Sequence, residues 1–307
     1  MIVVKNISKK LGDKQVLHDI SFHIGAFENV GIIGKNGAGK TTLLNIISGI
    51  LKPDSGFLRI HSAENAMEDY EILRKVTYVS GAKSQLWSEW KLKDSFENCA
   101  KMYHINKRDF AERLEKLSEI FEIKDCLNKK VQDLSLGQKM RGEIIYALLP
   151  EPEIILLDEA MIGLDVSVKY KIMKLFKEIK EEKKTTMIFT SHNLTEIEKL
   201  CDRIILIEEG NIIFDGSIEK IRKDVAPIYR LDIEVEGDFP DLEDLPIEKF
   251  MINQNKMSVS FDKQKIETVE LLRHISKRCA VKDVKIKQPN LEDTIRKIDK
   301  TKMNMKK

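Results

Sequence analysis

The sequence has 307 residues, of which 42% are hydrophobic and 33% charged, enough for one large globular domain or two smaller ones. Its formal net charge of only +2 gives no global electrostatic reason to expect a nucleic-acid-binding protein. The four cysteines lie far apart without a C-x-x-C pair, which argues against a metal cluster or disulfide framework and fits a reducing cytosol. No apolar run approaches the ~20 residues needed to cross a bilayer.

The first part of the chain predicts a pair of antiparallel strands. Residues 2–7 and 16–24 have strand-like patterns, and Gly12-Asp13 between them is a hairpin signal. The second run is interrupted near His18-Asp19, where we expect a break in the strand.

A phosphate-binding loop is predicted next. Residues 34–41, GKNGAGKT, fit the pattern G-x-x-x-x-G-K-[ST] at every fixed position, between an apolar strand at residues 29–33 and a helical pattern at residues 41–48. The glycines let backbone N–H groups point at a polyphosphate, Lys40 would reach the β- and γ-phosphates, and the Thr41 hydroxyl would hold Mg²⁺. The predicted nucleotide-binding residues of this segment are Gly34, Lys35, Asn36, Gly37, Ala38, Gly39, Lys40, Thr41 and Thr42.

The middle of the chain predicts a helical insert at about residues 85–150. It follows strands predicted at residues 57–60 and 76–80, and apolar residues recur at spacings of three and four between residues 92 and 127.

A second candidate anion-binding segment lies at residues 134–138, LSLGQ, which open a predicted helix to residue 149. Ser135 would cap this helix, and Gly137 would allow a close approach to an anion. The residues are therefore consistent with an ordinary helix cap or with a phosphate clamp made by Ser135, Gly137 and Gln138.

Two carboxylates end the next apolar run, IILLDE at residues 154–159, which is typical of a central parallel strand. If the neighbouring strand carries the phosphate-binding loop, Asp158 lies on the Mg²⁺ side and Glu159 can position a water molecule. The elements predicted after it are a helix at 166–184, a strand at 185–190 closed by Ser191-His192, a helix at 195–201, and a hairpin of strands 203–208 and 211–215.

Alternating strands and helices predict an α/β fold: a P-loop NTPase core with an N-terminal antiparallel β subdomain and the helical insert. We expect this domain to span residues 1–224. Residues 225–307 predict a small α+β accessory domain, because alternating apolar and polar residues at 229–235 and 257–261 indicate half-buried strands. The other elements predicted there are a helix at 266–275, a strand at 281–286 and a last helix at 291–298.

Taken in order, these motifs resemble the ATP-binding subunit of an ABC transporter over roughly residues 1–222. Residues 84–87 and 135–141, together with the C-terminal domain and its stretch at 289–293, resemble the ABC-2 type exporter branch. Residues 34–41 are similar to the family's Walker A motif, residues 134–138 to its signature, residues 156–159 to Walker B, residues 163–165 to the D-loop and Ser191-His192 to its switch histidine.

The resemblance implies an ATPase that powers export through a separate membrane permease, from the cytoplasmic face of the membrane. Two such subunits, identical or paralogous, would pack head to tail, with ATP and Mg²⁺ held by the phosphate-binding loop of one and the Ser135 segment of the other. Glu159 would act as general base, His192 would contact the γ-phosphate, and Asp165 would bridge the two sites.

The sequence departs from the family pattern at several positions. Ala82 stands where a glutamine usually reaches Mg²⁺ and the attacking water, and Gln85 follows three residues later as a potential substitute. Leu11 stands where an aromatic ring usually stacks on adenine. Ala160-Met161 replaces the usual Pro-Thr after the catalytic glutamate, which changes a linker rather than a chemical group.

Two alternatives remain open at this point. One is a degenerate regulatory partner in a heterodimeric transporter, which binds ATP and hydrolyses it poorly, as Ala82 and Leu11 suggest. The other is a soluble ABC protein acting on ribosomes or DNA, which the single phosphate-binding loop and the short insert disfavour. Trp87 and Trp90 lie where the family places its permease contact, and the residues are equally consistent with core positions in the insert.

Overall fold

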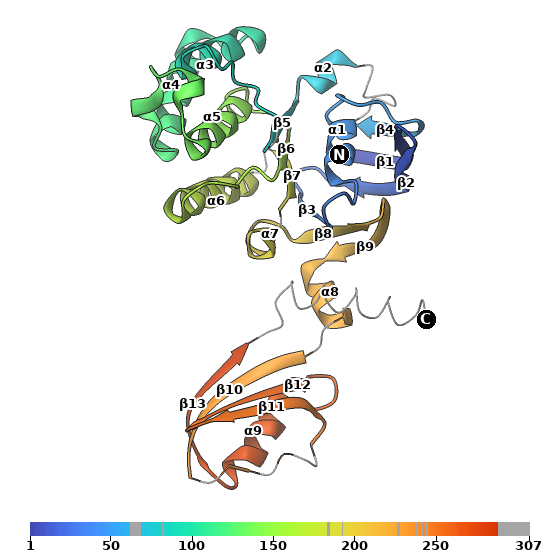
Figure 1. The fold of residues 1–307 in the computed structure, drawn as a ribbon, viewed down its shortest axis with the longest axis vertical. Coiled ribbons are helices and arrows are strands. Elements are labelled where there is room, and N and C mark those ends of the chain that lie inside the picture. The colour runs from blue at the N-terminus through green and yellow to red at the C-terminus, as the bar shows by residue number, and fades with distance from the viewer. Residues whose placement is uncertain are drawn as a thin grey trace. The chain divides into compact units, whose positions relative to one another are not determined.

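The computed structural model describes residues 1–61, 69–81, 83–182, 185–191, 193–225, 228–237, 239–240, 242 and 245–287 (Figure 1). The chain divides into two compact units, Met1–Gly216 and Ser217–Lys307. Each unit has its own hydrophobic cluster.

The N-terminal strands form a three-stranded antiparallel sheet in the order β2-β1-β4. The break predicted near His18-Asp19 is an irregularity within one continuous strand: Asp19 has a φ of +50° and the pairing with β1 shifts register on either side of it. Both long strands therefore extend further than their patterns suggested. Their bounds are β1 (Ile2–Leu11), β2 (Lys14–Ile24) and β4 (Ser55–Ile60).

A six-stranded sheet in the order β5-β6-β7-β3-β8-β9 forms the centre of the first unit. The neighbouring pairs from β5 to β8 are parallel, so the carboxyl ends of β3, β6 and β7 lie at one edge. Three of these strands, β3, β6 and β7, are buried at every residue, which agrees with their apolar sequences. The strands are β3 (Asn29–Ile33), β5 (Val76–Ser80), β6 (Ile154–Asp158), β7 (Thr186–Thr190), β8 (Arg203–Glu208) and β9 (Asn211–Ser217).

Helix α1 (Lys40–Ile47) lies between the two sheets, since its apolar residues Leu43, Leu44 and Ile46 share one core cluster with residues of both. On the other side of the central sheet in Figure 1 lie the helices of the insert. Where the sequence predicted a helical region at 92–127, the structure has two helices separated by a turn at His104, whose φ is +55°. The helices around the central sheet are α2 (Tyr70–Leu73), α3 (Leu92–Met102), α4 (Lys107–Ile120), α5 (Leu136–Leu148), α6 (Val166–Glu181) and α7 (Leu194–Leu200), with short 3₁₀ turns at Lys124–Cys126 and Val131–Asp133.

The second unit contains a four-stranded antiparallel sheet in the order β11-β12-β10-β13, with helix α9 on one face. Alternate apolar residues of β10 and β12, such as Leu231 and Val259, pack with Leu271 and Ile275 of α9. The sequence did not predict β11, an edge strand whose side chains are mostly exposed. The predicted last helix lies outside the described residues. The elements are α8 (Ile218–Val225), β10 (Ile228–Glu236), β11 (Ile247–Asn253), β12 (Lys256–Asp262), α9 (Thr268–Ser276) and β13 (Ala280–Lys287).

Candidate nucleotide site

The predicted phosphate-binding loop joins the carboxyl end of β3 to the N-terminus of α1, in the structural context that the sequence predicts. Gly37 and Gly39 have positive φ angles of +79° and +106°. A Cβ atom on Gly39 would lie 2.6 Å from Leu17, and one on Gly34 would lie 2.3 Å from the carbonyl oxygen of Ile207. The glycines are therefore required both by the backbone conformation and by the close packing of the loop.

Lys40 is the first residue of α1 and is only 6% exposed. Its Nζ donates hydrogen bonds to the carbonyl oxygens of Gly34, at 2.7 Å, and Lys35, at 3.1 Å. Burial lowers the pKa of Lys40, and the nearby charges of Glu159 and Asp158 oppose this shift. A phosphate group held by the loop would thus meet an ammonium group that is already in place and poorly solvated.

Asp158, the last residue of β6, accepts hydrogen bonds from three hydroxyl groups. Thr41 Oγ1 lies 2.8 Å from its Oδ2, Tyr78 Oη lies 3.1 Å from the same oxygen, and Thr190 Oγ1 lies 2.5 Å from Oδ1. The structure therefore brings Thr41 and Asp158 together across 117 residues of sequence. The expectation that the strand next to β6 carries the loop is wrong, because β7 lies between β6 and β3. Tyr78 and Thr190 were missed, although the strand register offered a signal, because β5 and β7 pair with β6 and end beside Asp158.

The oxygen atoms of Thr41 and Asp158 fit a magnesium ion, which prefers hydroxyl, carboxylate and phosphate oxygens. Within the described residues, no group of three or more His, Cys, Asp or Glu side chains could hold a metal. A magnesium ion at Thr41 and Asp158 would take its remaining ligands from water and from a bound polyphosphate.

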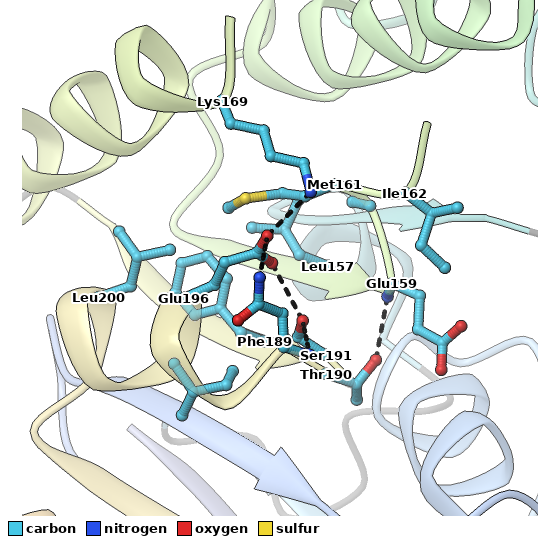
Figure 2. Close-up of a pocket in the computed structure, with 13 residues that line it drawn as sticks. Leu157, Glu159, Met161, Ile162, Lys169, Phe189, Thr190, Ser191, Glu196 and Leu200 are labelled. Atoms are coloured by element: carbon cyan, nitrogen blue, oxygen red, sulfur yellow. Dashed lines mark hydrogen bonds and ion pairs between the residues drawn. The ribbon is translucent and has the colours of Figure 1, made fainter. Parts of the chain in front are cut away.

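Glu159 follows β6 in the left-handed backbone region, with a φ of +54°. Its N–H donates to both the carbonyl oxygen and Oγ1 of Thr190, at 3.1 and 3.0 Å. Figure 2 shows its carboxylate directed away from the polar residues on the other side of Thr190. Thr190 thus fixes both adjacent acids: it binds the side-chain carboxylate of Asp158 and the backbone N–H of Glu159.

Those polar residues centre on the buried Glu196 of α7, beside a cavity of about 120 Å³ (Figure 2). Its carboxylate forms an ion pair with Lys169 of α6 at 3.0 Å, and accepts hydrogen bonds from Ser191 at 3.0 Å and Asn193 at 3.2 Å. The predicted switch histidine, His192, lies outside the described residues. The residues on either side of it, Ser191 and Asn193, both donate to the Glu196 carboxylate.

The segment at residues 134–138 forms a helix cap. Gln138 N–H donates to Ser135 Oγ at 3.3 Å and Gln138 Oε1 accepts from Ser135 N–H at 2.9 Å, a reciprocal capping box at the start of α5. A Cβ atom on Gly137 would lie 2.8 Å from the carbonyl oxygen of Gly163, so Gly137 is also required by packing within this chain. The Ser135 hydroxyl remains exposed and can still donate a hydrogen bond.

The two phosphate-binding segments do not meet within one chain. Figure 1 shows α5 and α1 on opposite sides of β5 and β6, so the two segments lie apart. Asp165 occupies the N-cap position of α6, where its carbonyl oxygen accepts a hydrogen bond from Lys169 N–H at 2.9 Å.

The departures from the family pattern have different structural settings. Leu11 is 47% exposed at the end of β1, so its side chain can contact a ligand. The Gln85 side chain donates to the carbonyl oxygen of Tyr78, whereas the Tyr78 hydroxyl is the group that contacts Asp158. Gln85 is therefore engaged elsewhere in this structure, and Ala82 lies outside the described residues.

Substituting Thr190 by valine should lower ATP turnover by about 10-fold or more, because it removes both the hydrogen bond to Asp158 Oδ1 and the one from Glu159 N–H and can displace both acids. Valine preserves the shape of a side chain that is only 3% exposed. Steady-state phosphate release and nucleotide titration measure the effect, and nucleotide affinity should change less than turnover.

The matched control for this experiment is Thr186→Val at the other end of β7, where Thr186 Oγ1 accepts a hydrogen bond from Phe27 N–H at 2.8 Å. This variant should lose similar stability and keep its turnover. Equal turnover losses in both variants would show that Thr190 acts only through the stability of the strand.

Comparisons with known proteins agree with this geometry. A family model described as "ABC transporter" matches residues 17–162. The chain is 31% identical over 225 residues to the ABC transporter ATP-binding protein NatA of Bacillus subtilis (strain 168), covering 72% of this chain and 91% of that protein. It is 33% identical over 224 residues to the methionine import ATP-binding protein MetN of Clostridioides difficile (strain 630), covering 72% of this chain and 70% of that protein.

Solved structures give the same result. One described as the ATP-binding subunit of an ABC transporter has a TM-score of 0.68 and 26% identity, covering 73% of this chain and 92% of its own. A dimeric post-hydrolysis structure of the ATP-binding cassette MJ0796 with ADP and Pi has a TM-score of 0.64 and 27% identity, covering 71% of this chain and 99% of its own. The chain belongs to the family of ABC transporter ATP-binding proteins, and it is an ATPase that uses ATP with Mg²⁺.

Proposed function

We propose that the chain is the energising subunit of an ABC exporter and acts as a dimer on a separate membrane permease. The observation that carries the dimer is the incomplete site: one chain places the phosphate-binding loop and the Asp158-Glu159 pair at one sheet edge, and the Ser135 cap elsewhere. A second copy or a paralogue would supply the missing Ser135, Gly137 and Gln138.

Exposed apolar side chains support the same arrangement. Leu136, at the start of α5, is 60% exposed and lies beside Gly163, while Ile162 next to Gly163 is 49% exposed. Val166 and Tyr170, four residues apart on α6, are 85% and 72% exposed. Large apolar groups gathered around a polar segment favour a surface that a partner covers, and the related cassette MJ0796 is described as a dimer.

In the proposed reaction each group of the site has one role. Lys40 neutralises the β- and γ-phosphates, and Thr41 with Asp158 would hold Mg²⁺, which supplies charge neutralisation when bound. Glu159 accepts a proton from the attacking water or orients it, and His192 contacts the γ-phosphate. Asp165 bridges the two sites of the dimer. Tyr78 and Thr190 orient the Asp158 carboxylate, and Thr190 also fixes the backbone of Glu159.

No helix among the described residues is long and apolar enough to span a membrane. On the resemblance to the family, we propose that a separate permease crosses the membrane and that this subunit acts at its cytoplasmic face. The proposed export direction rests only on the resemblance of residues 84–87 and 135–141 to the ABC-2 type branch. The relatives do not support one direction, because the related MetN protein is described as an import protein. We assign residues 1–224 to ATP chemistry and the rest of the chain to an accessory role.

Trp87 and Trp90 form the proposed permease contact. Their rings are stacked with centroids 5.1 Å apart and an interplanar angle of 18°. The two residues are 56% and 39% exposed, so the interpretation as core residues of the insert is wrong. A rigid aromatic pair in this position can anchor a helix of a partner protein.

Replacing Trp87 with alanine should abolish the stimulation of ATPase activity by the permease, because removing a central aromatic anchor typically costs about 2 kcal/mol or more of binding energy. The basal ATPase activity of the isolated subunit should remain. Phe57→Ala, which removes a 40% exposed ring from β4, is the matched control. Normal stimulation in the Trp87→Ala variant would rule out this contact.

The proposed function is tested by purifying the chain from membranes and measuring ATP hydrolysis. Co-purification with a polytopic hydrophobic protein that stimulates phosphate release supports it. ATP binding without any hydrolysis, alone or with that partner, would instead favour the regulatory subunit of a heterodimer.

A further inference from the structure

A buried carboxylate joins helix α5 to the segment after β5. Glu143 lies in α5 and is only 3% exposed. Its carboxylate accepts hydrogen bonds from the Ser84 hydroxyl, from Gln85 N–H at 3.0 and 3.1 Å, and from Leu86 N–H at 3.4 Å. One side chain of the helix thus holds three successive residues that lie 57 to 59 positions earlier in the chain.

Packing alone does not account for a carboxylate at this position. Burial raises the pKa of Glu143, and the hydrogen bonds from Ser84, Gln85 and Leu86 oppose the rise. A buried carboxylate is expensive unless several donors replace its lost hydration, so an apolar side chain would fill the space at lower cost. The carboxylate instead provides hydrogen bonds of defined direction to residues 84–86, which form no strand or helix of their own.

Close packing reinforces this attachment. A Cβ atom on Gly142 would lie 2.9 Å from Leu92 Cδ1 and 3.0 Å from Leu86 Cδ1, so α5 touches the segment directly beside Glu143. The Gln85 side chain donates to the Tyr78 carbonyl oxygen, which ties the same segment to β5.

The attached segment leads directly to the stacked tryptophans. The carbonyl oxygens of Ser88 and Trp90 each accept a hydrogen bond at 2.9 Å, from Gln132 N–H and Val131 N–H. Residues 131 and 132 precede the Ser135 cap of α5. Residues on both sides of the exposed pair are therefore held in place. Glu143 of α5 holds residues 84–86, and residues 131 and 132, which precede α5, hold Ser88 and Trp90.

We propose that Glu143 is a positioning residue that makes residues 84–90 move as one body with α5, so that displacement of the nucleotide-contacting helix reaches the Trp87–Trp90 pair. Two parts of this proposal rest on the proposed function: that α5 contacts nucleotide, and that the Trp87–Trp90 pair contacts the permease. The attachment itself rests on the contacts of Glu143.

The chain contains only two tryptophans, so its indole signals report on this segment alone. In full-length protein without nucleotide, Glu143→Met removes every acceptor and preserves side-chain volume. It should abolish the circular-dichroism couplet of the stacked indoles, red-shift their emission and increase acrylamide quenching. Glu97→Met, at a half-buried position of α3, is the matched control and should keep all three signals. An unchanged couplet and emission in a folded Glu143→Met protein would overturn the proposal.

A second arm adds ATP and Mg²⁺. The emission of the native protein should shift on binding, and the Glu143→Met protein should bind nucleotide with similar affinity and show no shift. An equal shift in both proteins would overturn the relay. Failure of the native protein to bind or hydrolyse ATP would contradict the proposed function, and the nucleotide-free comparison would still test Glu143.

Ser84→Ala provides the second variant if Glu143→Met does not fold. It leaves α5 intact and removes the hydroxyl that donates to Glu143. The expected result is the same change of the indole couplet and emission to a smaller extent. Signals identical to those of the native protein would count against the proposal.

Discussion

Replacing Lys40 with alanine is expected to abolish ATP binding. The ammonium group is buried within the loop and is positioned by the carbonyl oxygens of Gly34 and Lys35. Hydrogen bonds to charged groups contribute about 1.5–3 kcal/mol each, so losing contacts to two phosphates weakens binding by ~100-fold or more. Titration with a fluorescent ATP analogue measures the loss.

The weakened contacts elsewhere make this dependence stronger. Leu11 has no aromatic ring to stack on adenine, and Ala82 has no oxygen or nitrogen in its side chain, so more of the affinity must come from the phosphate-binding loop. Lys52→Ala, at an exposed position after α1, is the control and should bind ATP normally. A Lys40→Ala protein that still bound ATP tightly would show that the loop does not hold the phosphates in the proposed way.

Replacing Glu159 with glutamine should lower the rate of ATP hydrolysis by ~100-fold or more, since a positioned general base typically contributes a factor of 10²–10⁴. ATP binding should persist, because the backbone bond from Glu159 N–H to Thr190 does not involve the substituted group. Single-turnover and steady-state phosphate release, with and without the permease, separate the chemical step from product release.

Glu153 offers a matched control at the opposite end of the same strand. It precedes β6 and forms an ion pair with Lys75 at 2.7 Å, and its other carboxylate oxygen lies 2.8 Å from His61 Nε2. Glu153→Gln removes the same charge from the same chain and should leave turnover unchanged. Unchanged turnover in the Glu159→Gln protein, measured with its permease, would mean that the catalytic assignment is wrong.

The phosphate-binding loop could be recognised from sequence because its chemistry is local. Its glycines, Lys40 and Thr41 lie within eight consecutive residues, and the flanking strand and helix are equally short-range features. The apolar run that ends in Asp158 likewise identified a buried parallel strand from its own composition.

Edge and turn features were less accessible. The sequence did not reveal β11, because an edge strand with mostly exposed residues carries little alternation. It also left open whether residues 134–138 are a cap or a clamp. The structure contains the cap, and the hydroxyl of Ser135 remains available for an anion.

The sequence by itself determined the α/β fold, the nucleotide chemistry and the family, because these follow from short motifs in a fixed order. Only the tertiary structure decided that Tyr78 and Thr190 share Asp158 with Thr41, and that Glu143 holds residues 84–86. These contacts join residues separated by 32 to 117 positions. Parallel strand register and helix packing determine such contacts, and neither is encoded in any single stretch of the chain.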